Sequence, residues 1–127
     1  MTLIPENLKY TDEHEWLRIE GDTAVVGITD YAQHELGDIV YVELPPVGKK
    51  AEVKKAFGVV EAVKTVSDIF APVSGEIVAV NEALAADASV VNREPYGQGW
   101  MIEIKMSNPA DTGALLGPAE YRKLLGE

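Results

Sequence analysis

Two apolar runs with a single lysine between them occupy residues 58–77, which read GVVEAVKTVSDIFAPVSGEI. β-branched residues are frequent in both runs, as they are in strands, and Pro72 and Gly75 bracket a turn that follows them. If the chain reverses at Val63 and Lys64, the two runs form a β-hairpin with the lysine at its tip. The segment therefore indicates a mainly β protein that presents one amine to solvent.

Further short strands are expected on both sides of this hairpin. The residue pattern predicts a second hairpin over residues 15–28. Thr29 or Asp30 can cap a helix that runs through Leu36 and is closed by Gly37. The other expected elements are strands at 38–44, 59–63, 76–80 and 100–104 and a helix at 118–125. Many short strands separated by glycine and proline turns are typical of a mainly β fold.

The sequence also contains a weak internal repeat. The pattern Gly-acid-Ile-Val-x-Val occurs twice, and each copy is followed by a glycine-led apolar strand that ends in lysine. The two copies are residues 37–42 and 75–80, and the strands that follow them are 58–64 and 99–105. Two related half-sheets that face each other would form a pseudo-twofold β-sandwich. Of the two repeated lysines, only Lys64 lies in a hairpin setting, because the chain after Lys105 leads into a helical tail.

Composition excludes several classes of function. The 127 residues are 46% hydrophobic and 25% charged, which fits one globular domain over residues 1–127. The net charge of −10 argues against binding to nucleic acid or to an anionic membrane surface. The absence of cysteine excludes disulfides, thiolate metal sites and a cysteine nucleophile. No apolar run approaches the ~20 residues of a membrane span, and no signal pattern begins the sequence, so we expect a cytoplasmic protein.

Conventional catalytic or metal sites are not indicated. His14 and His34 do not have the spacing of metal ligands. A lysine used in catalysis needs burial to lower its pKa, whereas Lys64 at a hairpin tip is accessible to another enzyme. Spacing alone leaves two interpretations of Lys64 open: an ordinary surface lysine or a modified one. A local basic island could be a solvated loop or a docking patch; it comprises Lys49, Lys50, Lys54 and Lys55.

Residues 61–64, with residues 67–69 and 71–76, resemble the lipoylation segment of the glycine cleavage system H-protein family. The resemblance continues in order along nearly the whole chain. Its further pieces are residues 14–17, 27–29, 32–33, 36–38, 44–45, 48, 91–92, 95–96 and 99–100. The departures are Ala62 and Thr65, where the family usually has serine and alanine. Both lie near Lys64 and bear only on the efficiency of lipoylation.

The resemblance implies a fold, a cofactor and recognition residues. The fold is a barrel-sandwich hybrid of two small sheets related by a pseudo-twofold axis, with short helices that include one at the C-terminus. Lys64 is expected to carry lipoate in amide linkage, which removes the lysine charge. Glu61 and Gly75 match positions that lipoylating enzymes recognise, and we expect one of them on each strand of the hairpin.

The resemblance also implies a cleft that holds the lipoyl arm once the arm carries its cargo, an aminomethyl group. A cationic amine on the arm requires carboxylates, and Glu15 and Asp68 match the family positions for this role. Glu13 is their neighbour, although the family often has a small polar residue at its position. Closure of the arm against the protein body would keep water from the labile cargo.

The function implied by the resemblance is transport and not catalysis. An H protein carries the aminomethyl group from the pyridoxal phosphate-dependent glycine decarboxylase (P protein) to the tetrahydrofolate-dependent aminomethyltransferase (T protein). Dihydrolipoamide dehydrogenase (L protein) then reoxidises the arm. A lipoate ligase or a lipoyl/octanoyl transferase would attach it, and we expect a monomer.

Three other readings remain open at this point. The first is a lipoyl or biotinyl carrier domain of another complex, or a lipoyl-relay protein. Biotinyl domains usually flank their lysine with methionine, whereas Val63 and Thr65 flank Lys64. The second is a small lysine-dependent enzyme, and the third is an interaction module of the same fold.

Overall fold

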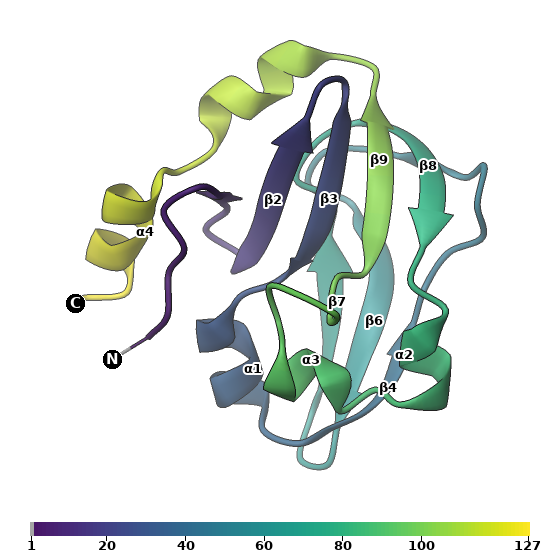
Figure 1. Ribbon diagram of the computed structural model, residues 1–127, viewed down its shortest axis with the longest axis vertical. Coiled ribbons are helices and arrows are strands. Elements are labelled where there is room, and N and C mark those ends of the chain that lie inside the picture. Colours follow the sequence, from purple (N-terminus) through teal and green to yellow (C-terminus); the bar gives the residue numbers. More distant parts are fainter. Residues whose placement is uncertain (1) are drawn as a thin grey trace.

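The computed structural model describes residues 2–127 as two antiparallel β-sheets with short helices at their margins (Figure 1). The strand order is β1-β2-β3-β9-β8-β5 in the six-stranded sheet and β4-β6-β7 in the three-stranded sheet. The strands are β1 (Lys9–Tyr10), β2 (Glu15–Glu20), β3 (Thr23–Ile28), β4 (Ile39–Glu43), β5 (Lys50–Ala51), β6 (Ala56–Ala62), β7 (Val66–Phe70), β8 (Gly75–Val80) and β9 (Ile102–Met106). The helices are α1 (Asp30–Leu36), α2 (Ala83–Ala86), α3 (Val90–Arg93), the 3-10 helix η1 (Pro109–Ala114) and α4 (Pro118–Leu124).

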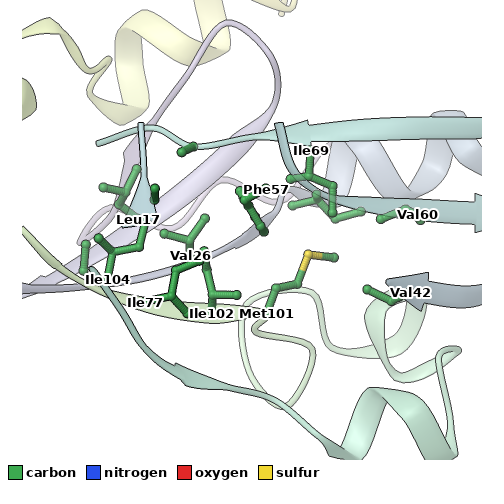
Figure 2. Packing of buried hydrophobic residues seen from close by; sticks show 14 of the residues in the cluster. Leu17, Val26, Val42, Phe57, Val60, Ile69, Ile77, Met101, Ile102 and Ile104 are labelled. Carbon is green, nitrogen blue, oxygen red and sulfur yellow. The ribbon is translucent and has the colours of Figure 1, made fainter. Parts of the chain in front are cut away.

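The main hydrophobic core lies between the two sheets. Leu17, Ile102 and Ile104 of the six-stranded sheet belong to the same buried cluster as Val60 and Ile69 of the three-stranded sheet (Figure 2). A second cluster packs α4 and the N-terminal segment against the outer face of β2 and β3. It comprises Ile4, Leu8, Tyr10, Trp16, Val25 and Tyr121. Because both faces of β3 are covered, its sequence is an almost continuous apolar run.

The internal repeat corresponds to the two-sheet architecture. Its first copy supplies β4, which pairs with β6, and its second copy supplies β8, which pairs with β9. Both ladders shift register at equivalent places, between Ile39 and Tyr41 in one and between Ile77 and Ala79 in the other. A shared irregularity of this kind supports the pseudo-twofold relationship between the half-sheets.

Several expected elements are confirmed. β2 and β3 form the hairpin expected over residues 15–28, and α4 is the expected C-terminal helix. Thr29 is the N-cap of α1, where its side chain accepts a hydrogen bond from the backbone N–H of Ala32. The last strand ends at Met106, two residues beyond the prediction, because the N–H of Met106 still donates to the carbonyl oxygen of Asp22. Within residues 2–127, no helix has the length and apolar character needed to cross a bilayer.

Candidate functional site

Lys64 lies at the tip of the β6–β7 hairpin, as the sequence predicted. The backbone N–H of Ala62 donates to the carbonyl oxygen of Thr65 at 2.8 Å and closes a loop in which only Val63 and Lys64 lie between the bonded residues. Both loop residues are exposed, and 76% of Val63 is accessible to solvent. The loop between β6 and β7 projects at the lower end of the view in Figure 1. The structure therefore exposes Lys64 at the end of a hairpin.

The segment between α1 and β4 supports this tip. The N–H of Val63 donates to the carbonyl oxygen of Asp38 at 3.0 Å. Asn92 of α3 fixes the same segment, because its side-chain amide donates to the carbonyl oxygen of Gly37 and accepts from the N–H of Ile39, both at 2.9 Å. Gly37 has a φ of +80°, which disfavours any residue with a Cβ. A Cβ there would also lie 3.2 Å from Cε of Lys64, so glycine leaves room for the lysine.

The expected recognition residues lie on different sheets. Glu61 is on β6, opposite Tyr41 and Val66 on the two neighbouring strands. Gly75 begins β8 in the six-stranded sheet, so the expectation that the two residues occupy the two strands of the hairpin is wrong. A Cβ at Gly75 would collide with the carbonyl oxygen of Lys105 on β9. The close approach of β8 to β9 therefore requires this glycine.

The three expected cleft residues do come together. A cavity of about 260 Å³ is lined by the turn before β2, by α1 and by the β6–β7 hairpin, and Glu13, Glu15 and Asp68 all contribute to its lining. Asp68 lies on β7, four residues beyond Lys64, a distance of at most about 13 Å at ~3.3 Å per residue. The cleft therefore lies within reach of a long, flexible group attached to Lys64.

A second cavity, of about 300 Å³, adjoins the first and shares Glu13 and Glu15 with it. Its other walls include Phe70 and Pro72, which lie farther along the chain from the hairpin tip. Phe70 is six residues from Lys64, about 20 Å by the same spacing. The smaller cavity is thus the better placed of the two for a group carried by Lys64.

Glu15 is the most buried carboxylate of the cleft, with 2% of its surface exposed. Its side chain accepts hydrogen bonds from the hydroxyl of Thr11 at 2.6 Å and from the N–H of Phe70 at 3.2 Å. Burial raises the pKa of Glu15 to about 7; these hydrogen bonds act in the opposite direction, and the charges of Glu13 and Asp12 add to the rise. A cation placed beside Glu15 would favour its ionised form.

The turn formed by residues 11–15 shapes the wall of the cleft next to Glu15. The Thr11 hydroxyl accepts the N–H groups of Glu13 and Glu15, at 3.2 and 3.1 Å. His14 adopts a left-handed conformation with a φ of +68°. His14 lies between Glu13 and Glu15 in this turn, and it too belongs to the cleft lining.

Sequence reasoning missed part of the cleft lining. Tyr31 and Glu35 project from α1, Ser67 lies on β7, and His14 completes the wall. Tyr31 and Glu35 are four residues apart, so they share a helix face, and this spacing after the Thr29 cap was the available signal. No comparable pattern marks His14 or Ser67, because their positions depend on how the two sheets meet.

None of the four lysines of the basic island lines the 260 Å³ cleft, although Lys54 lines the adjoining 300 Å³ cavity. All four of these lysines are exposed, and Lys55 forms an ion pair with Glu52 at 3.4 Å. The island precedes β6 at Ala56, whereas Lys64 follows the other end of this strand. In the described part of the chain, no group of three or more His, Asp or Glu residues is arranged to hold a metal ion.

Comparisons with known proteins agree with this geometry. The family model of the glycine cleavage H-protein matches residues 8–127. The glycine cleavage system H protein of Chlorobaculum parvum is 60% identical over 126 residues, and the match covers 98% of this chain and 98% of the relative. That of Carboxydothermus hydrogenoformans is 50% identical over 127 residues, which is 100% of this chain and 98% of the relative. The crystal structure of an H protein from Mycobacterium marinum matches with a TM-score of 0.90 and 41% identity, over 98% of this chain and 100% of that one.

Fold, hairpin and comparisons together define a non-catalytic carrier protein. The chain belongs to the glycine cleavage H-protein family. Its function is that of the lipoyl-bearing carrier of the aminomethyl group, and proteins of this family carry lipoyllysine. Membership of the glycine cleavage system implies the P, T and L proteins as partners. Family membership therefore argues against the two alternative interpretations of the chain as a biotinyl domain or as a lysine-dependent enzyme.

Proposed function

We propose that residues 1–127 act as one carrier domain in which Lys64 bears the lipoyl group and the 260 Å³ cleft shelters the loaded arm. The observation that carries this proposal is the position of Lys64 at the exposed hairpin tip, beside β7, the strand that contributes Asp68 to the cleft. Lys64 forms no ion pair with any residue from 2 to 127, so its amine is free for acylation. The local structure therefore fits an attached lipoyl chain.

The cleft residues would bind the cargo by charge. When bound, lipoate supplies the sulfur that carries the aminomethyl group. The ionised carboxylate of Glu15 would accept a charge-assisted hydrogen bond from the cationic amine, and Glu13 and Asp68 would add negative potential at the same cavity. The apolar part of the wall, which includes Ile28 and Leu36, would limit the access of water to the cargo.

We also propose that the attaching enzyme, a lipoate ligase or a lipoyl/octanoyl transferase, contacts Glu61. This carboxylate is partly exposed on the hairpin that ends at Lys64. Gly75 would contribute indirectly, since its close packing against β9 supports the sheet that faces the hairpin strands. We propose that the protein works as a cytoplasmic monomer, since a single projecting arm suffices for successive visits to three partners.

Paired lysine variants test the proposal. Lys64→Arg keeps the charge but removes the amine that forms the amide, so we expect no lipoyl incorporation and no glycine decarboxylation in the reconstituted system. Lys105→Arg is the matched control, because Lys105 occupies the equivalent place in the internal repeat and lies in the middle of a sheet. It should retain both activities. Incorporation of lipoate into Lys64→Arg would refute the assignment.

A further inference from the structure

His14 belongs to a chain of hydrogen bonds that runs from the cleft into the core. Its Nδ1 lies 2.8 Å from the hydroxyl of Tyr121, which lies 2.8 Å from the hydroxyl of Thr29. Tyr121 and Thr29 are fully buried. Tyr121 comes from α4 near the C-terminus, so a residue far away in sequence contacts a residue of the cleft wall.

The hydrogen atoms of this chain can be assigned by counting donors and acceptors. The Thr29 hydroxyl accepts the N–H of Ala32 at 3.2 Å, so its own hydrogen can go to the Tyr121 oxygen. The Tyr121 hydrogen then goes to Nδ1 of His14. The reverse direction would leave the buried Thr29 hydrogen without an acceptor among residues 2–127, which is costly in a protein interior. Nδ1 of His14 is therefore an acceptor, and a neutral ring carries its proton on Nε2.

The second ring nitrogen has no partner among the described residues. No described residue forms a hydrogen bond with Nε2 of His14, and this part of the chain contains no buried side-chain nitrogen without a partner. Nε2 is therefore accessible, and His14 is one of the residues that line the cavity containing Glu15. The Tyr31 ring lies 4.7 Å away, centroid to centroid, and restricts the imidazole from the α1 side.

The surroundings of His14 favour the neutral imidazole. Burial lowers the pKa of His14 and outweighs the opposing charges of Glu13, Asp12 and Glu35. A neutral His14 adds no positive charge to the cleft and so does not compete with a cationic cargo for Glu15. It offers an N–H donor in a cavity whose carboxylates are acceptors.

We propose that His14 is a further arm-binding residue, held by Tyr121 as the neutral Nε2–H tautomer so that Nε2–H donates to a sulfur of the lipoyl group. The proposal rests on the proposed function, because it requires the arm to enter this cleft. Tyr121 and Thr29 act as positioning residues. Glu15 and Asp68 would bind the amine while His14 binds sulfur. The amine of the aminomethyl group and the sulfur that carries this group would therefore have different partners.

Nitrogen-15 NMR of the histidine side chains tests the tautomer in the unmodified protein. We expect the Nε2–H pattern for His14 in the native chain. Tyr121→Phe removes one hydrogen bond from Nδ1 and should shift the tautomer ratio about fivefold toward Nδ1–H. His34 is an internal control in the same spectrum, since its side chain is 69% exposed and forms no hydrogen bond with Tyr121. An Nδ1–H pattern for His14 in the native chain would overturn the proposal.

The contact with the arm needs a second measurement, in which lipoylated protein loaded with the aminomethyl group is compared with unmodified protein. We expect the Nε2–H proton of His14 to exchange with water about fivefold more slowly when the arm occupies the cleft. Unchanged exchange, together with a lipoyl group shown by mass on Lys64, would refute the role of His14 and leave the attachment site intact. A lipoyl group on another lysine would instead refute the proposed function.

Discussion

The side chain of Glu15 accepts a hydrogen bond from the backbone N–H of Phe70 at 3.2 Å. This bond joins the first residue of β2 in one sheet to the last residue of β7 in the other. The carboxylate that faces the cleft is therefore also a link between the two sheets. Its protonation should influence both the stability of the fold and the retention of cargo.

The first prediction concerns stability and pH. Burial raises the pKa of Glu15 from its ordinary value of 4.5 to about 7, so between these values the folded protein holds a proton that the unfolded chain has released. The contribution of Glu15 to the free energy of unfolding is greatest below pH 4.5 and is lost as the pH rises through 7. The loss amounts to about 3 kcal/mol. Urea titrations at several pH values, followed by tryptophan fluorescence, measure it.

Glu15→Gln isolates this effect from the other carboxylates. Glutamine keeps the size and an acceptor oxygen but does not titrate, so the difference in unfolding free energy between the native chain and the variant should change across this pH window. Parallel curves for the two proteins would show that the pKa of Glu15 is not raised.

The second prediction concerns retention of the cargo. Glu15→Ala removes the buried carboxylate of the cleft, so the loaded protein should release ammonia about tenfold faster above the pKa of Glu15, because a charge-assisted hydrogen bond is lost. Release is measured on loaded protein without the T protein. Glu76→Ala is the control, since Glu76 is an exposed carboxylate on β8 outside the cleft lining. Equal rates in the two variants would remove Glu15 from the site.

The third prediction separates structural and recognition roles of Gly75. Gly75→Ala places a Cβ against the backbone of β9 and should lower the free energy of unfolding by about 1–3 kcal/mol. Gly113→Ala is a matched control, because a Cβ at Gly113 meets nothing within 4 Å. Lipoylation of the folded Gly75→Ala protein should proceed at the native rate. A slowed reaction in fully folded protein would mean that the attaching enzyme reads Gly75 directly.

The fourth prediction tests the support beneath the hairpin tip. Asn92→Ala removes the side chain that bonds to Gln33, Gly37 and Ile39. We expect a loss of about 1–3 kcal/mol in unfolding free energy, since these polar groups lose their partner. Asn7→Ala replaces an exposed asparagine and should change stability by less than about 0.5 kcal/mol. Similar stabilities for the two variants would contradict the role of Asn92.

Much of the fold could be predicted because the decisive signals are local. The reversal at Val63 and Lys64, the Thr29 cap and the repeat that supplies β4 and β8 all depend on short patterns. The short strands β1 and β5 could not be found, because two-residue strands have no periodicity and arise from tertiary pairing.

The site was predictable only in part. Resemblance to the family selected Glu13, Glu15 and Asp68, and the structure places all three at one cavity. Gly75 was misplaced because its expected position came from the family resemblance, although the internal repeat assigns residues 75–80 to the second half-sheet. The link from His14 to Tyr121 joins distant parts of the chain, so it could not be seen before the fold was known.

Peptide mapping by mass spectrometry shows directly whether Lys64 carries the lipoyl group. Protein isolated from cells that lipoylate it would be digested, and every lysine-containing peptide would be searched for a lipoyl group. We expect one modification, on the peptide that contains Lys64, in the same preparation that supports glycine decarboxylation. Active protein with an unmodified Lys64, or with the lipoyl group on another lysine, would contradict it.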